Sequence, residues 1–152
     1  MLPYAPTIPG RAAMARSAAF TLLELMIVVT ILAIIMAIAI PSVQNAKKNA
    51  AGAAAIGRLK TTLTVSEQYF LRFGRYASTV DNFVSSSMMP DYNTSSNSGY
   101  SYTYRSGTST WSMNADPKIP GTSGDNYFFI DQTGVIRFSS TGPATSTSAP
   151  VD

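Results

Sequence analysis

An uninterrupted apolar run near the N-terminus constrains this chain more than any other feature. Residues 20–40 read FTLLELMIVVTILAIIMAIAI, and their only polar members are Thr21, Glu24 and Thr30. At 1.5 Å per residue, a helix of this length spans about 31 Å, which matches the roughly 30 Å hydrocarbon thickness of a bilayer. The sequence therefore predicts one membrane-crossing helix over this run.

The flank that precedes the run predicts its orientation. Residues 1–19 contain Arg11 and Arg16 and no acidic residue, and such flanks stay on the cytoplasmic side of a membrane. We therefore expect residues 42–152 to be exported. A cleaved signal peptide is one alternative, but its apolar region usually has about 7–15 residues, and no small-residue cleavage box follows Ile40. A plain single-pass anchor that carries an exported domain is the other.

Composition limits the chemistry that this chain can perform. It has no His and no Cys, and only 12% of its residues are charged. Zinc sites with soft ligands, Cys nucleophiles, Ser-His-Asp triads and disulfides are thereby excluded. We expect neither an enzyme nor a cofactor. The formal charge of +3 is too small to indicate nucleic-acid binding, and Arg72, Arg75 and Arg105 come from distant segments, so we expect no nucleic-acid partner.

Glu24 is the one ionisable side chain in the apolar run. A carboxylate in a membrane span costs about 2.5–3.5 kcal/mol at the centre and less near the interface, so it needs a partner. No Lys, Arg or His occurs in residues 20–40. If the chain were cut between Ala19 and Phe20, the new α-amine would lie about one helical turn from Glu24. Such a cut would create an acid–base pair, within one chain or between neighbouring chains.

The segment FTLLELMIVVTILAIIMAIAIPS, residues 20–42, resembles the N-terminal signature of type IV prepilins and of the related type II secretion pseudopilins. In that family a basic leader ends before a Phe, a Glu is the fifth residue of the mature chain, and a Pro follows the apolar run. Phe20, Glu24 and Pro41 occupy these positions here. One departure is Ala19, which stands before the cleaved bond where the family usually has Gly.

The resemblance implies a processing and assembly route. A membrane-embedded prepilin peptidase would remove the cytoplasmic leader, residues 1–19, and Phe20 would be N-methylated. The precursor would lie in the bacterial inner membrane, with its N-terminus in the cytoplasm. An inner-membrane assembly platform would then add it to a homo-oligomeric filament with other pilins. Glu24 would neutralise the Phe20 amine of an adjacent subunit and so set the axial register.

Two kinds of filament remain open, a cell-surface type IV pilus and a periplasmic type II secretion pseudopilus. A long polar loop and a tail rich in Ser and Thr favour the exposed surface of a pilus used for adhesion, motility or DNA uptake. Many pilins carry a C-terminal disulfide, and its absence here weakens the pilus interpretation. Glu24 argues against the tip-initiating pseudopilin, which characteristically lacks this acid.

Residues 42–74 continue the helix as an amphipathic segment. Apolar residues recur there at helical spacing, namely Ile56, Leu59, Leu63 and Phe70. Gly74 is placed to end the helix. Pro41 lies inside the pattern and predicts a kink or a locally melted turn, because a proline in a helix interior costs about 3 kcal/mol.

The rest of the chain predicts a small antiparallel sheet. Residues 75–99 read as a connecting loop, with a short helix near residues 79–83. Residues 100–140 contain alternating segments and turn signals for three or four strands, and the closing DNYFFIDQTGVIR is similar to the last hairpin of many pilins and pseudopilins. Residues 141–152 form a polar tail that we expect to fray. The predicted class is α+β and type IV pilin-like, with a long kinked N-terminal helix packed on a 3–4-stranded sheet.

Two side-chain groups in the predicted sheet region each have two interpretations. Three acids have the hard oxygen ligands that calcium prefers, namely Asp116, Asp125 and Asp131. Their spacing does not match an EF-hand loop, so we expect separate turn acids and no metal. Four aromatic residues alternate along the predicted strands, namely Tyr100, Tyr102, Tyr104 and Trp111. We expect them to pack on the helix rather than to form an exposed contact surface.

Overall fold

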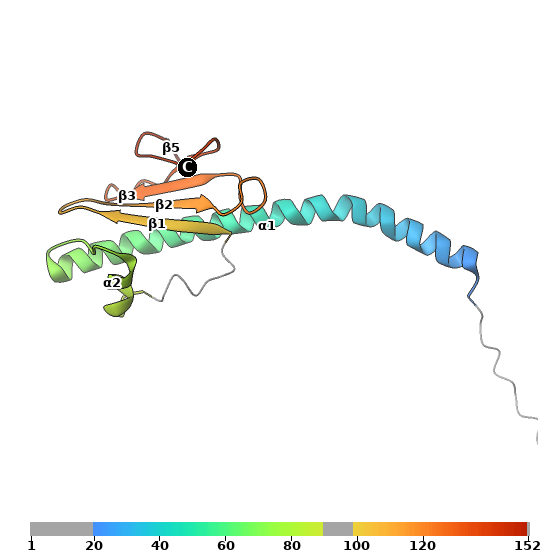
Figure 1. Ribbon diagram of the computed structural model, residues 1–152, viewed down its shortest axis with the longest axis horizontal. Coiled ribbons are helices and arrows are strands. Elements are labelled where there is room, and N and C mark those ends of the chain that lie inside the picture. The colour runs from blue at the N-terminus through green and yellow to red at the C-terminus, as the bar shows by residue number, and fades with distance from the viewer. Residues whose placement is uncertain (1–19, 90–98, 152) are drawn as a thin grey trace, which may run out of the picture. The chain divides into compact units, whose positions relative to one another are not determined.

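The computed structural model describes residues 20–89 and 99–151, which form two helices and five strands (Figure 1). In chain order these elements are α1 (Leu22–Phe73), α2 (Val80–Ser85), β1 (Tyr100–Ser106), β2 (Trp111–Pro117), β3 (Tyr127–Asp131), β4 (Arg137–Ser139) and β5 (Ala149–Pro150). The chain divides into two compact units, Met1–Ile38 and Ala39–Asp152, which we call the first and the second unit. The leader, residues 1–19, and a part of the predicted connecting loop, residues 90–98, lie outside the described residues.

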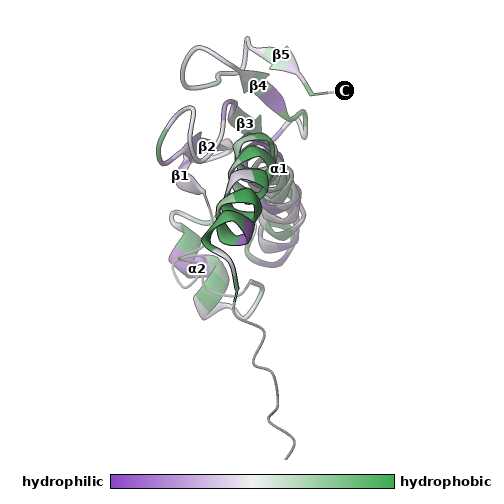
Figure 2. Ribbon diagram, turned by 90° about the vertical axis from the view of Figure 1, so that its right-hand side faces the viewer, coloured by the Kyte–Doolittle hydropathy of each residue, from purple (hydrophilic) through white to green (hydrophobic). Residues whose placement is uncertain are grey.

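The described part of the first unit is the apolar beginning of α1. Helix starts at Leu22, two residues after the apolar run begins, and every described residue up to Ile38 is exposed. Figure 2 shows this part of α1 coloured as hydrophobic over most of its length. Among the described residues, α1 is the one helix that is long and apolar enough to cross a membrane. The predicted spanning helix is therefore confirmed as a helix of suitable length and composition.

In the second unit, α1 buries one face against the sheet. Apart from one adjacent pair, the buried positions recur every three or four residues, the period of a helix face, and they are Ala55, Leu59, Thr62, Val65, Ser66 and Tyr69. The helix ends where the sequence predicts, because Gly74 adopts a φ of +68° and its N–H donates to the Phe70 carbonyl at 2.8 Å. The predicted helix is present, and of its four named apolar residues Leu59 is buried, Ile56 and Leu63 are half-buried, and Phe70 is exposed.

The sheet is fully antiparallel, and its strands follow chain order from β1 to β5. The register of the first hairpin pairs Tyr100 with Pro117 and Ser106 with Trp111. The sheet has five strands where the sequence predicts three or four. The fifth comes from the polar tail, in which Ala149 pairs with Phe138. The tail does not simply fray, because it satisfies backbone groups at the edge of β4 that would otherwise have no ladder partner.

Two hydrophobic clusters hold the second unit together. The larger lies between α1 and the strands, and its buried members are Ala55, Leu59, Tyr100, Trp111, Met113, Ala115, Phe128, Ile130 and Ile136. The smaller joins the end of α1 to α2, and its buried members are Val65, Tyr69, Ala77, Phe83 and Met89. Tyr104 connects the two, because its ring stacks on Trp111 at 5.9 Å and meets Phe83 edge-on at 5.5 Å. The predicted short helix is confirmed as α2, and buried Phe83 anchors it.

Candidate assembly site at the start of the apolar helix

Of the predicted processing and assembly residues, Glu24 lies in the first turn of α1, Phe20 lies just before the helix, and Ala19 lies outside the described residues. Phe20 precedes the helix and is 75% exposed. Thr21 occupies the N-cap position, and its Oγ1 accepts a hydrogen bond from the Glu24 N–H at 3.1 Å. The same hydroxyl donates to Glu24 Oε2 at 3.4 Å. A threonine cap satisfies an otherwise free helix N–H, and a carboxylate in the first turn is favoured by the helix dipole.

The local role of Glu24 is one that the sequence analysis missed. Thr-x-x-Glu before an apolar run is a recognised helix-start pattern, and Thr21 and Glu24 have that spacing. Glu24 therefore has a partner within its own chain and contributes to the helix start. Its side chain is nevertheless exposed, so the carboxylate is also accessible to a group on another molecule.

The apolar surface that follows this turn has no cover from the described residues. Its exposed large side chains are Leu22, Leu23, Leu25, Met26, Ile27, Val28, Val29, Ile31, Leu32, Ile34, Ile35, Met36 and Ile38. Thr30 lies within this surface, and its hydroxyl is satisfied inside the helix, because Oγ1 donates to the Met26 carbonyl at 2.7 Å. An exposed apolar surface of this extent requires lipid or protein contact.

Pro41 lies within α1, and the residues on both sides of it are helical. A proline lacks the N–H that would continue the hydrogen-bond ladder, and its ring crowds the carbonyl four residues earlier. The local melting that the sequence allows is not seen, because the helix continues through this position. The predicted kink at Pro41 remains a prediction.

The structure does not bring the three candidate calcium ligands together. Asp125 forms an ion pair with Lys48, with 2.9 Å between Oδ2 and Nζ. Asp131 accepts hydrogen bonds from the backbone and the hydroxyl of Thr133. Asp131 pairs with the first half of β2, at Ser112, roughly 14 Å along the sheet from Asp116 at 3.4 Å per residue. Over residues 20–89 and 99–151, no three His, Cys, Asp or Glu side chains gather as a metal site would require.

The aromatic residues occupy the positions that the sequence predicts. Tyr100 and Trp111 are buried in the larger cluster, and Tyr102 and Tyr104 are half-buried against it. The aromatic face of the sheet therefore packs on α1, as expected. The three arginines considered for nucleic-acid binding are exposed. Arg72 lies on α1, Arg75 follows α1, and Arg105 lies on β1.

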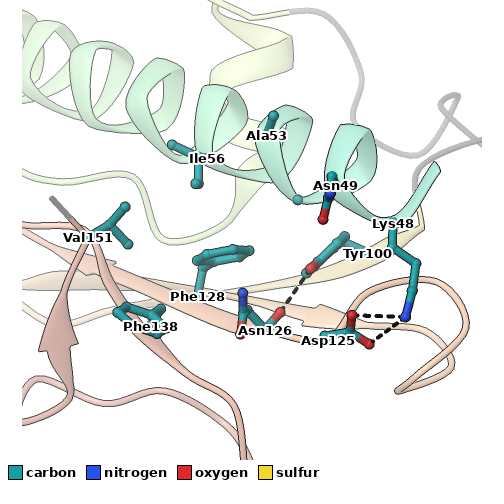
Figure 3. A pocket seen from close by; sticks show the side chains of 11 residues that line it. Lys48, Asn49, Ala53, Ile56, Tyr100, Asp125, Asn126, Phe128, Phe138 and Val151 are labelled. Atoms are coloured by element: carbon teal, nitrogen blue, oxygen red, sulfur yellow. Dashed lines mark hydrogen bonds and ion pairs between the residues drawn. The ribbon is translucent and has the colours of Figure 1, made fainter. Parts of the chain in front are cut away.

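One feature of the second unit escaped the sequence analysis because its parts are 77 residues apart. Figure 3 shows the Lys48–Asp125 ion pair at one end of a cavity between α1 and the sheet. The cavity has a volume of about 370 Å³. Ile56 and Phe128 line its apolar wall. The Tyr100 hydroxyl donates to the Asn126 carbonyl at 2.9 Å, and burial, followed by the charge of Asp125, raises the pKa of Tyr100. No local sequence signal could have identified this pairing.

The match with known proteins covers the start of α1 and does not extend to the sheet. No curated protein matches the chain in sequence. A family model described as the prokaryotic N-terminal methylation motif matches residues 14–40. The match contains the Ala19–Phe20 bond and Glu24, and it ends where the apolar run ends at Ile40. The chain thus carries the prepilin-type cleavage and methylation motif of the type IV pilins and pseudopilins.

Proposed function

We propose that this chain is a structural subunit of a type IV pilus and not an enzyme. The precursor is inserted in the inner membrane through residues 20–40, cleaved by a prepilin peptidase between Ala19 and Phe20, and N-methylated at Phe20. An assembly platform then adds it to a helical filament. The observation that carries this proposal is the exposed apolar surface of α1, which begins directly after Phe20 and bears a single carboxylate, Glu24.

The same surface serves in two environments in this proposal. In the precursor it contacts lipid, and in the filament it contacts the equivalent helices of neighbouring subunits. Glu24 then neutralises the Phe20 amine of an adjacent subunit where charge is poorly solvated. Loss of one partner from a desolvated ion pair typically costs about 3–5 kcal/mol, which is enough to decide whether subunits enter the filament in register.

Processing is tested by mass spectrometry of the exported protein. The proposal requires a mature chain that begins with N-methylated Phe20, after loss of residues 1–19. An inactive prepilin peptidase should leave the full-length precursor in the membrane. An exported protein that retains Met1 contradicts the assignment.

The assembly role of Glu24 is tested against its capping role. We expect Glu24→Ala to insert normally in the membrane and to form no filaments, because the charge partner of Phe20 is lost. Thr21→Ala is the matched control, because it removes the hydroxyl that contacts Glu24 and keeps the carboxylate. It should cost about 1 kcal/mol at the helix start and leave assembly intact, as counted by electron microscopy. Normal filaments from Glu24→Ala would exclude the assembly role, and equal loss in both variants would indicate capping alone.

The second candidate is a pseudopilin of a type II secretion system. The observation that favours it is the absence of Cys, because many pilins carry a C-terminal disulfide. Electron microscopy of filaments sheared from cells with and without the gene separates the two. Surface filaments that disappear with the gene support the pilus, whereas unchanged filaments together with defective protein secretion support the pseudopilus. If neither changes, the chain is a single-pass anchor that carries an exported domain.

A further inference from the structure

Trp111 lies at the centre of a group of aromatic rings in the second unit that the proposed function does not use. It is the only tryptophan of the chain, and it is 2% exposed at the start of β2. Among the described residues, two tyrosine rings contact its indole, Tyr104 at 5.9 Å and Tyr76 at 6.5 Å between centroids. In a chain without Cys, tryptophan and tyrosine are the side chains that lose one electron most readily. These contacts therefore give an oxidised Trp111 a nearby source of an electron.

The surroundings of Trp111 do not stabilise its oxidised form. Its Nε1 is buried and has no hydrogen-bond partner among the described residues, so no acceptor there can take the proton of this N–H donor. Removal of one electron leaves a radical cation within the larger hydrophobic cluster. An unpaired charge in such a place is unfavourable. An electron from a neighbouring ring would remove this charge.

The nearer tyrosine, Tyr104, lacks a base for its proton. A tyrosine that gives up an electron must also release its hydroxyl proton, because the oxidised phenol is a strong acid. The Tyr104 hydroxyl is buried without a hydrogen-bond partner among the described residues. Burial raises the pKa of Tyr104 to about 12, and the nearby Ser66 hydroxyl opposes this only in part. Since a serine hydroxyl is not a base at neutral pH, Tyr104 is a poor electron donor despite its short ring contact.

The other tyrosine, Tyr76, has a base within reach. Its hydroxyl donates to Glu67 Oε1 at 3.2 Å, which is close enough for proton transfer. Burial, followed by the charge and the hydrogen bond of Glu67, raises the pKa of Tyr76, so the hydroxyl keeps its proton at neutral pH. The end of α1 creates this contact, because Gly74 ends the helix with a φ of +68°. Phe70, one turn after Glu67, then packs its ring against Tyr76 at 4.8 Å.

We propose that Tyr76 and Glu67 repair a one-electron oxidation of Trp111. After a one-electron oxidant has removed an electron from the indole, the Tyr76 ring passes one electron to Trp111, and the Tyr76 hydroxyl proton moves to the Glu67 carboxylate. Trp111 is restored, Tyr76 becomes a neutral phenoxyl radical, and Glu67 becomes a neutral acid. The step removes the buried cation and the carboxylate charge together.

The radical then lies where a reductant can reach it, because Tyr76 is half-buried whereas Trp111 is buried. A one-electron reductant in solution, such as ascorbate, supplies the electron that restores Tyr76, and Glu67 returns the proton. The hydrophobic cluster thus keeps an intact indole. This activity lies entirely within the second unit and does not depend on filament assembly.

Transient absorption after a laser pulse tests the electron transfer in the full chain in detergent. A near-ultraviolet pulse that tryptophan absorbs and tyrosine does not absorb ejects one electron from Trp111. A cobalt(III) ammine complex in solution takes up this electron irreversibly. The absorption of the tryptophan radical should then decay at the rate at which that of a tyrosine radical grows. Decay of the tryptophan radical without any tyrosine radical overturns the proposal.

Two matched variants identify the tyrosine that donates. Tyr76→Phe keeps a ring beside Trp111 and removes the hydroxyl, so it should abolish the tyrosine radical and prolong the tryptophan radical. Tyr104→Phe is the control, because it changes the nearer ring in the same way, and it should leave both signals unchanged. Near-ultraviolet circular dichroism checks that both variants keep the packed cluster. Loss of the tyrosine radical in Tyr104→Phe alone would assign the donor to Tyr104 and contradict the proposal.

The role of Glu67 is tested by a change that keeps its size. Glu67→Gln can still accept the Tyr76 hydrogen bond but cannot take the proton, so electron transfer should slow by at least about 100-fold. The wild-type rate should also fall in heavy water, because a proton moves together with the electron. A purely structural role of Glu67 would give no such isotope effect. An unchanged rate in Glu67→Gln would exclude Glu67 as the proton acceptor.

Repair is measured separately by the fate of Trp111. Under continuous illumination with the cobalt(III) complex and ascorbate, mass spectrometry should find oxygenated Trp111 accumulating faster in Tyr76→Phe than in the wild-type chain. Tyr104→Phe should accumulate it at the wild-type rate. Equal accumulation in all three proteins would mean that the transfer does not protect the indole, which overturns the repair function.

Discussion

The surroundings of Asp116 disfavour the ionised form of its carboxyl group. Its Oδ1 is buried and has no hydrogen-bond partner among the described residues. Loss of hydration raises the pKa of Asp116, and the positive charge of Arg105 opposes this effect only in part. The ionised carboxylate is therefore less favourable in the folded protein than in the unfolded chain.

We expect Asp116→Asn to raise the unfolding temperature at neutral pH. The raised pKa means that the folded protein holds this proton more tightly than the unfolded chain, whose ordinary value is 3.8. The corresponding stability is present below pH 3.8 and is lost as the pH rises through the folded-state pKa. Thermal unfolding followed by circular dichroism should show a gain at pH 7 that disappears below pH 3.8. The exposed control Asp81→Asn should give no gain, and a lower unfolding temperature for Asp116→Asn at pH 7 would contradict this interpretation.

At the scale of elements, the two parts of α1 differ in the exposure of their side chains. Up to Ile38 every described position is exposed, and from Ala55 onward one face is buried. Leu59 is 0% exposed between α1 and the sheet, whereas Leu71, on another face of the same helix, is 84% exposed. Helix propensity is the same for the two leucines, so packing alone distinguishes them.

This contrast predicts unequal effects of the same substitution. Leu59→Ala should lower the free energy of unfolding by about 2–5 kcal/mol, because it removes buried apolar contacts and leaves a cavity. Leu71→Ala should change it by less than about 0.5 kcal/mol. Denaturant titration of the two variants measures both values. Similar losses would mean that the face of α1 described here is not the packed one.

The tail is the element whose contribution is most easily removed. The Val151 N–H donates to the Ile136 carbonyl at 2.8 Å, and Arg137 Nη1 donates to the Ser148 carbonyl at 2.9 Å. We expect truncation after Thr145 to free the edge of β4 and to speed amide hydrogen exchange at Phe138, while exchange in β1 stays slow. Thr147→Ala is the control, because it keeps β5. Unchanged exchange at Phe138 in the truncated chain would show that β5 does not protect this edge.

At the scale of the whole molecule, the second unit contains its own core. Both hydrophobic clusters and all five strands lie within Ala39–Asp152. Residues 20–38, the described part of the first unit, contribute nothing to either cluster. The apolar run is therefore available for lipid or for other subunits without loss of the folded domain.

We accordingly expect residues 39–152, expressed alone, to fold as a soluble domain with one cooperative unfolding transition. Circular dichroism and sedimentation should show a folded monomer, because the exposed apolar surface of the run has been removed. The full chain under the same conditions should require detergent. A non-cooperative transition of the shorter chain would mean that the apolar part of α1 stabilises the domain.

The features that could be predicted from sequence are those with a local cause. The apolar run predicts the beginning of α1, and Gly74 predicts its end. The helical spacing of Ile56, Leu59 and Leu63 predicts the face that packs on the sheet. Each of these signals depends only on neighbours along the chain. The aromatic alternation from Tyr100 likewise predicts the sheet face that packs on α1. The capping pair of Thr21 and Glu24 also has a local signal, because the two residues have the Thr-x-x-Glu spacing of a helix start.

What only the tertiary structure decided depends on segments that are distant in the chain. The pairing of Ala149 with Phe138 adds a fifth strand to a tail whose composition indicates fraying. The ion pair of Lys48 with Asp125 fixes a loop beside the helix and leaves the candidate calcium ligands apart. Sequence by itself determined the membrane-length helix, its processing motif and the class of fold, because hydrophobic length and period are local properties. The pairing of Asp125 with Lys48 and of the tail with β4 depends on packing. A charge or a free strand edge can pair only with a complementary group that the fold brings within reach.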